Sequence, residues 1–169
     1  MKTTVPVVLL TVLMISITAF EWRHTEVDAK EKIGLQVITA LQRSSAHEFS
    51  ALFPTLSDFH GLMLRNAEMY GVNLTEAARE FEKEFEEILF PEFKNSFERI
   101  LNEGRSAGID WRTIRFASVQ VAEPADSSFS SAPMTISFTS NGEVYHLKVE
   151  KALMIDGEWK LSQHISFEK

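Results

Sequence analysis

The chain has 169 residues, a net charge of −7 at pH 7 and no cysteine. Its length is that of one domain, and 44% apolar with 24% charged residues is an ordinary globular composition. The lack of cysteine excludes disulfides, thiolate metal sites and a cysteine nucleophile. The acidic balance argues against a basic, nucleic-acid-binding surface, so we expect no nucleic-acid partner.

The first 20 residues have the pattern of an export signal. Lys2 is the only charged residue before Glu21, and the stretch from Val5 to Phe20 is almost wholly apolar. A basic start and a short apolar core are typical of a secretory signal, and the stretch is shorter than the roughly 20 apolar residues of a membrane span. Residues 1–20 are interpreted as a signal peptide or, alternatively, as an N-terminal membrane anchor that tethers the protein through residues 5–20.

Both interpretations predict an exported protein, periplasmic or secreted if the signal is cut and held at the membrane if it is kept. Residues 21–169 then form a single domain. Exported domains often carry disulfides, but one of this size can be stable through its core alone. The missing cysteines therefore favour a protein of the bacterial envelope.

Helical patterns fill residues 26–103. Apolar residues recur at every third or fourth position from Val27 to Leu41. Capping signals follow, a stronger one at 45–48 and a weaker one at 55–58. The longest predicted helix covers residues 73–102 and contains Pro91, which lacks a backbone donor and predicts a kink or a break. Five glutamates between residues 80 and 87 are interpreted as a solvated helix face rather than a surface for a cation or basic partner.

An antiparallel sheet is predicted over residues 110–168. In the first strand, 111–121, the alternation of apolar residues slips, and a bulge near Ala117–Ser118 would restore it. Asn141-Gly142 is a strong hairpin signal. A two-residue loop there places three apolar pairs on one face, namely Phe138 with Tyr145, Ile136 with Leu147, and Met134 with Val149.

The second hairpin turns at Asp156-Gly157. Here a three-residue loop over 155–157, with a glycine bulge, keeps the apolar alternation and places Leu153 beside Trp159. Two polar residues, Lys151 and Gln163, then lie on the apolar face of the sheet. They are either rim residues whose stems cover the core or polar groups in a pocket between sheet and helices.

No sequence motif marks a catalytic or metal site. The chain has no phosphate loop, glycine fingerprint, zincin motif or EF-hand loop, and no pair of histidines has the helical spacing of metal ligands. His146 and His164 are predicted on the polar face of the sheet, where scattered surface histidines are more common than a site. We therefore assign no catalytic residues and expect no metal and no cofactor.

The last hairpin resembles that of nuclear transport factor 2-like and cystatin-like domains, on the segments Tyr145-His-Leu-Lys-Val149 and Asp156-Gly-Glu-Trp-Lys-Leu161. In the order of its elements the resemblance covers about residues 25–169. It implies an α+β fold in which N-terminal helices pack on one face of a curved, four-stranded antiparallel sheet, like a cone. The chain departs from the family in lacking a strand pair among its helices, so the cone is incomplete and no catalytic residue is carried over.

These observations predict an exported, non-enzymatic binding or interaction domain of the bacterial envelope, with an unknown small ligand or protein partner. The alternative is a small pocket enzyme of the isomerase or hydrolyase type, whose pocket would be lined by Tyr145, Lys151 and Gln163. It would need an enclosed cavity with a buried carboxylate to serve as base. A further possibility is a homodimer formed through the polar sheet face that carries Thr135, Ser137 and Thr139.

Overall fold

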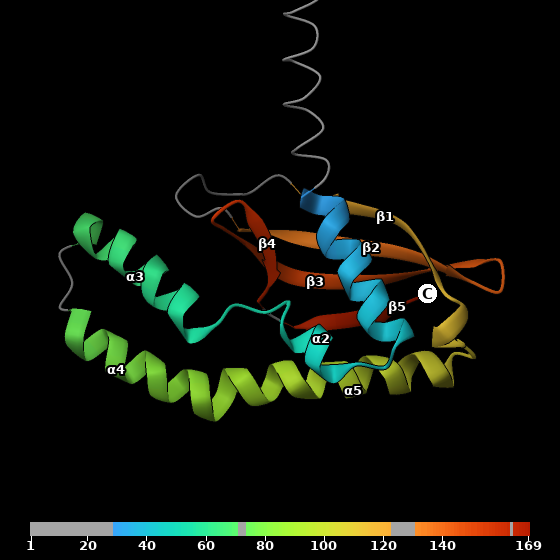
Figure 1. The fold of residues 1–169 in the computed structure, drawn as a ribbon, viewed down its shortest axis with the longest axis horizontal. Helices are drawn as coiled ribbons and strands as arrows, with labels where there is room; N and C mark the ends of the chain where they lie inside the picture. The colour runs from blue at the N-terminus through green and yellow to red at the C-terminus, as the bar shows by residue number, and fades with distance from the viewer. Residues whose placement is uncertain (1–28, 71–73, 123–130, 163) are drawn as a thin grey trace, which may run out of the picture.

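The computed structural model describes residues 29–70, 74–122, 131–162 and 164–169. Helices occupy the first part of this chain and an antiparallel sheet the second (Figure 1). The N-terminal helix, described over residues 29–42, crosses in front of the strands, while α3 and α4 extend beyond the end of the sheet. The predicted α+β class is confirmed.

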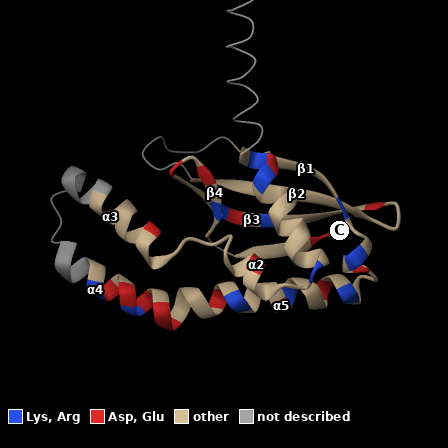
Figure 2. Ribbon diagram, viewed as in Figure 1, with Lys and Arg blue, Asp and Glu red and all other residues tan. Residues whose placement is uncertain are grey.

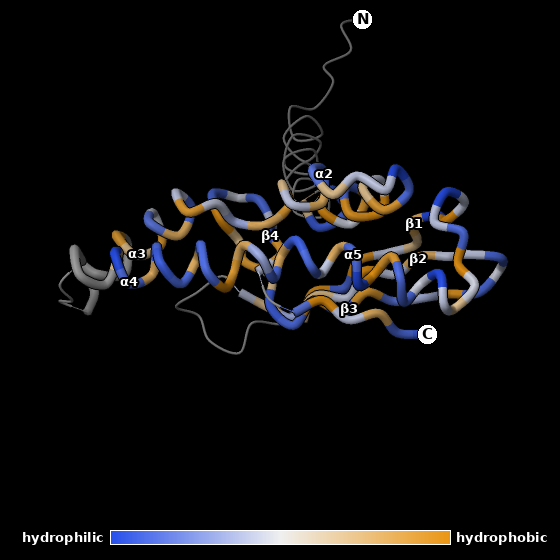
Figure 3. Tube along the Cα trace, turned by 90° about the horizontal axis from the view of Figure 1, so that it is seen from below, coloured by the Kyte–Doolittle hydropathy of each residue, from blue (hydrophilic) through white to orange (hydrophobic). Residues whose placement is uncertain are grey.

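Six further helical segments follow the N-terminal helix. They are α2 (Ala46–Ser50), α3 (Leu56–Tyr70), α4 (Leu74–Glu84), a π-helical turn (Phe85–Leu89), α5 (Phe90–Ser106) and a 3-10 turn (Trp111–Thr113). Asp and Glu gather along α4 (Figure 2), and hydrophobic and hydrophilic residues alternate along α4 and α5 (Figure 3). The alternation is that of amphipathic helices, with one side against the protein. Among the helices described, none combines the length and the apolar character needed to cross a membrane.

Both predicted capping signals are present. The Ser45 hydroxyl accepts the backbone N–H of Glu48 at 3.2 Å at the start of α2. Before α3, the backbone N–H of Asp58 donates to Thr55 Oγ1 at 3.2 Å, and the Asp58 carboxylate accepts the backbone N–H of Thr55 at 2.7 Å. These bonds satisfy donors that a helix start leaves without intrahelical partners.

Pro91 does not break the long helix. The irregularity lies in the turn before it, where the N–H of Phe90 bonds to the carbonyl of Phe85, five residues back. Because Pro91 has no N–H and its ring crowds the carbonyl four residues earlier, a wider π-helical turn accommodates it and α5 continues. The sequence also predicts a helix end at Gly71, but this position lies outside the described residues.

The sheet has strands β1 (Arg115–Val121), β2 (Ser131–Ser140), β3 (Glu143–Ile155), β4 (Glu158–Leu161) and β5 (Ile165–Glu168). They run in the order β1-β2-β3, and both β4 and β5 pair with β3. Strand β5 pairs with residues 146–149 of β3, and β4 pairs with residues 152–155. The five strands therefore occupy four positions, which agrees with the predicted four-stranded sheet.

The predicted register of the first hairpin is confirmed. Phe138 lies opposite Tyr145, and the other two predicted pairs, 136 with 147 and 134 with 149, are also present. The bulge in β1 is confirmed as well, because the pairing with β2 shifts between Phe116 and Ser118.

The predicted loop of the second hairpin is wrong. Asp156 and Gly157 form a two-residue turn with φ of 50° and 82°, so Ile155 pairs with Glu158 and Met154 with Trp159. The extra residue lies earlier, in β3, where Glu150 and Lys151 face the interval between Ala132 and Met134 of β2. That interval is Pro133, which cannot donate to the ladder and is tolerated in a strand at such a bulge.

The core lies between the sheet and the helices that cover it, α5 and the N-terminal helix among them. Its fully buried side chains include Phe49, Phe138, Leu41, Ile100, Ile114, Met134, Ile136, Leu147, Leu161 and Ile165. Two glycines allow close approach between layers. A Cβ at Gly34 would come within 2.6 Å of the Phe116 ring, and one at Gly104 would overlap the Trp111 indole. The indole Nε1 donates to the Leu101 carbonyl of α5 at 3.0 Å.

Candidate functional site

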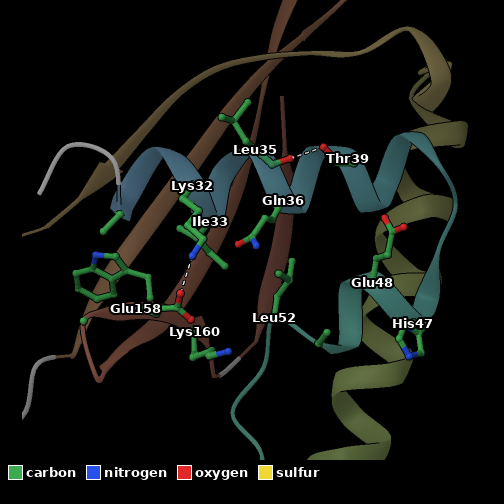
Figure 4. A pocket seen from close by; sticks show the side chains of 14 residues that line it. Lys32, Ile33, Leu35, Gln36, Thr39, His47, Glu48, Leu52, Glu158 and Lys160 are labelled. Carbon is green, nitrogen blue, oxygen red and sulfur yellow. Dashed lines mark hydrogen bonds and ion pairs between the residues drawn. The ribbon is translucent and has the colours of Figure 1, made fainter. Parts of the chain in front are cut away.

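A pocket of about 640 Å³ lies between the N-terminal helix, α2 and the β3–β4 hairpin (Figure 4). Its volume is within the range of about 300–1,000 Å³ that is typical of small-ligand sites. The pocket is lined by Ala29, Lys32, Ile33, Leu35, Gln36, Thr39, His47, Glu48, Ala51, Leu52, Gly157, Glu158, Trp159 and Lys160.

Each wall is positioned by local structure described above. Positions 29, 32, 33 and 36 recur at helical spacing, so the N-terminal helix presents them on one side. The capped start of α2 places His47 and Glu48 at the end of the pocket away from β4 (Figure 4). The tight turn at Asp156-Gly157 leads into β4, whose first three residues form the opposite wall together with Gly157.

An ion pair joins the helix wall to the strand wall. Lys32 Nζ lies 2.6 Å from Glu158 Oε1, and both side chains are more than half exposed, at 57% and 55%. The hydrogen bond from Lys32, and then the charges of Lys32 and Lys160, hold the pKa of Glu158 below its ordinary value. Glu158 is therefore an ionised carboxylate at neutral pH.

Charge at the far end of the pocket is also paired. Arg43 Nη1 donates to Glu48 Oε1 at 3.0 Å, with the Glu48 side chain 41% exposed. The Lys160 ammonium, in contrast, makes no hydrogen bond and no ion pair with a side chain that the structure describes, although its charge acts on Glu158. Its positive charge is left to water or to a ligand.

The rest of the lining is largely apolar. Ile33 and Leu52 are buried and belong to the core, while Leu35 is 49% exposed. Trp159 is partly buried and packs against the core. Its indole Nε1 is shielded and finds no acceptor in the described part of the chain. The pocket thus joins an apolar surface to a few charged groups, the combination usual in binding sites.

The carboxylates of the pocket are poorly suited to general-base catalysis. Such a base needs burial that raises its pKa toward the working pH, but Glu48 and Glu158 are both exposed and Glu158 has a lowered pKa. Within the described residues, no group of three or more His, Cys, Asp or Glu side chains could hold a metal ion.

Two of the three predicted ligand-binding residues, Tyr145 and Lys151, do not line this pocket. Tyr145 is buried, stacks on Phe138 at 5.7 Å, and donates its hydroxyl to Glu143 at 2.7 Å. Lys151 is exposed in the bulge of β3, because the extra residue there turns it away from the apolar face. Gln163 lies outside the described residues, and a shared binding role for the three stays a prediction.

The histidines on the sheet have separate partners. His146 Nδ1 lies 2.9 Å from the Ser137 hydroxyl, and His164 Nδ1 lies 3.2 Å from Arg99 Nη2 of α5. Four of the pocket residues, those at positions 157–160, stand in the motif that carried the family resemblance. Nothing in the sequence links them to Lys32 or Gln36, because the N-terminal helix and β4 meet only in the folded chain.

Comparison with known proteins gives one structural similarity. No family model and no curated protein matches the sequence. The fold is similar to the crystal structure of a cystatin-like protein from Ruminococcus gnavus, with a TM-score of 0.49 and 12% sequence identity. The match covers 89% of this chain and 47% of that protein, so this chain spans about half of its length. The α+β class of the chain rests on its own helices and strands, and the resemblance to nuclear transport factor 2-like domains stays a prediction.

Proposed function

We propose that this chain is an exported, non-enzymatic binding domain of the bacterial envelope, and that its ligand occupies the pocket between the N-terminal helix and β4. The observation that carries the proposal is the pocket itself: a ligand-sized volume of about 640 Å³ in which apolar side chains adjoin a cation with no described partner. The expectation of export comes from the apolar stretch of residues 5–20.

The alternative enzyme is less well supported than a binding domain. Its sequence hypothesis requires a buried carboxylate in an enclosed cavity, whereas both carboxylates of this pocket are exposed. We therefore keep binding as the proposal and make turnover an outcome of its test.

The test is a small-molecule screen on the full chain, read by thermal shift and by native mass spectrometry. Gln36→Trp fills the pocket from an exposed helix position that Figure 4 shows beside it. Glu31→Trp is the matched control, on the same helix but not in the pocket lining. We expect ligands that stabilise the wild type and the control but not Gln36→Trp.

Three outcomes would contradict the proposal. If no compound binds, or if every bound compound is retained by Gln36→Trp, the pocket is not the ligand site. If a compound is turned over with saturable kinetics, the domain is an enzyme. The export part is tested by the mass of the protein purified from its host: a cut or membrane-retained N-terminus supports export, and an intact protein recovered from the cytoplasm opposes it.

A further inference from the structure

The β4 end of the pocket carries more positive than negative charge. Two ammonium groups, those of Lys32 and Lys160, face the single carboxylate of Glu158. The ion pair uses Lys32, and Lys160 is left without a partner among the described residues. Figure 4 shows the labelled Lys160 side chain reaching from β4 toward the space between the strand and the helix.

At the other end the charges are balanced and turned toward each other. Glu48 is held by Arg43 at 3.0 Å, and Figure 4 shows Glu48 and His47 on α2, away from Lys160. The two carboxylates that could bind a cationic ligand, those of Glu48 and Glu158, are therefore already in ion pairs. An anionic ligand could bind the ammonium of Lys160. Charge complementarity favours an anion near Lys160.

The pocket lining also has an apolar part. Ile33 and Leu52 are buried side chains of the lining. Leu35, a large hydrophobic side chain of the same lining, is 49% exposed. Covering such a side chain removes apolar surface from water, which favours binding. A ligand that meets both features has an apolar body with an anionic group at one end.

We infer that the ligand is a single-chain amphiphile with an anionic head, of the long-chain carboxylate class. Its head lies at Lys160, and its chain covers Leu35, Ile33 and Leu52. This inference rests on the proposed function, since it names the chemical class of the ligand for the same pocket.

The experiment titrates the full chain with three ten-carbon probes that differ in head group: decanoate, decan-1-ol and decylammonium. All are used below their micelle concentrations, with binding read by native mass spectrometry and by calorimetry. Because a charge-assisted hydrogen bond is among the stronger polar contacts, we expect decanoate to bind at least about tenfold more tightly than decylammonium. Decyl phosphate in a parallel titration distinguishes a phosphate head from a carboxylate: tighter binding of decanoate supports the inference, and tighter binding of decyl phosphate would contradict the carboxylate class.

The variants separate the head from the chain. Lys160→Gln should weaken decanoate about tenfold and leave decan-1-ol unchanged, and Lys160→Arg should restore decanoate binding. The matched control is Lys151→Gln, which removes an exposed lysine of β3 that does not line the pocket. Leu35→Ser, at an exposed position, should weaken decanoate and decan-1-ol alike.

The possible failures are distinct. If decan-1-ol or decylammonium binds as tightly as decanoate, or if Lys160→Gln has no effect, the anionic head is wrong while the pocket remains a binding site. If no ten-carbon probe binds but compounds from the screen are blocked by Gln36→Trp, the amphiphile class is wrong and the proposed function stands. If nothing binds in the pocket, both fail.

Discussion

The two hairpins of the sheet have the same turn and very different surroundings. Asn141-Gly142 has φ of 52° and 84°, and Asp156-Gly157 has φ of 50° and 82°. Both are two-residue turns in the left-handed region that such residue pairs adopt readily. The β2–β3 hairpin lies at a closed, tightly packed end of the molecule, whereas the β3–β4 hairpin borders the pocket. The difference therefore comes from what packs beside the strands.

Aromatic rings fill the closed end. Phe138, Tyr145 and Phe167 come from three neighbouring strands, and Tyr145 stacks on each of the other two rings at 5.7 Å. Trp111 lies 5.6 Å from Phe138 and covers the stack from the helix side. The Tyr145 hydroxyl and the Lys169 ammonium both donate to Glu143, at 2.7 and 2.9 Å.

At the open end, beside the β3–β4 hairpin, fewer side chains pack against the sheet than at the closed end. Strand β4 has four residues, and the cross-strand pair Met154 and Trp159 is only partly buried. The strand is joined to the N-terminal helix by an exposed ion pair, Lys32 with Glu158, and contributions of that kind are small. One end of the sheet is thus closely packed, and the other borders the pocket.

The strongest test of this comparison removes one tryptophan from each end. Trp111→Ala should lower the free energy of unfolding by about 3–5 kcal/mol, because the indole is 4% exposed and donates to Leu101. Trp159→Ala should cost clearly less, since its side chain is partly exposed beside the pocket. Urea titrations of both variants measure the difference. Equal losses would contradict the division into a closed and an open end, and Trp111→Phe replaces Trp111→Ala if that variant does not fold.

A smaller effect is expected where helix α5 meets the closed end. A Cβ on Gly104 would come within 2.6 Å of Trp111 Cε2 and still closer to Cζ2, so Gly104→Ala should destabilise by about 1–3 kcal/mol through overpacking. Gly61 of α3 has no atom within 4 Å of the same position. Gly61→Ala should therefore stabilise by about 0.5–1 kcal/mol through helix propensity. Thermal unfolding checks both, and a stabilising Gly104→Ala would show that the indole is not closely packed.

The smallest expected effect concerns acid stability. Hydrogen bonds from Lys169 and Tyr145 hold the pKa of Glu143 below its ordinary value in the folded chain. The stabilisation from this carboxylate is therefore present above its unfolded pKa and is lost as the pH falls through the folded pKa. Glu143→Gln should lose less stability than the wild type between about pH 7 and pH 3.

Glu158→Gln at the open end should behave in the same way, because Lys32 and Lys160 also lower the pKa of Glu158. The measurement is the urea midpoint at each pH, and both effects should shrink in high salt. Equal acid responses would sharpen the comparison by leaving packing as the difference between the two ends. A steeper acid loss in either variant would contradict the assigned ion pairs.

The sequence predicts the parts of the fold that depend on neighbours along the chain. The register of Phe138 with Tyr145 follows from a hairpin signal and from apolar residues that fall on one face in only one alignment. The caps at Ser45 and Thr55 are likewise local. The extra residue of the second hairpin could be placed in either the loop or the strand, and the effect of Pro133 on the neighbouring strand depends on a pairing that the sequence does not reveal.

The pocket was missed for a similar reason. It forms where the N-terminal helix overhangs an edge strand more than 120 positions later, as the bond from Lys32 to Glu158 shows. Such long-range contacts leave no periodic pattern in either segment. Lys151 and Gln163, the two polar residues on the predicted apolar face, instead led to a predicted pocket on the face of the sheet and not at its edge.

The bulge at Glu150 and Lys151 determines which face of the sheet the following side chains occupy. If Glu150 and Lys151 alternated regularly instead of sharing the position opposite Pro133, and with the same two-residue turn, every later side chain of β3 and β4 would point to the opposite face. Leu161, now fully buried, would be turned to solvent together with Trp159. The bulge, formed by two exposed residues that do not line the pocket, thus keeps Leu161 and Trp159 on the side of the core. Deletion of either Glu150 or Lys151 would leave a regular ladder in which the same side chains still face the core.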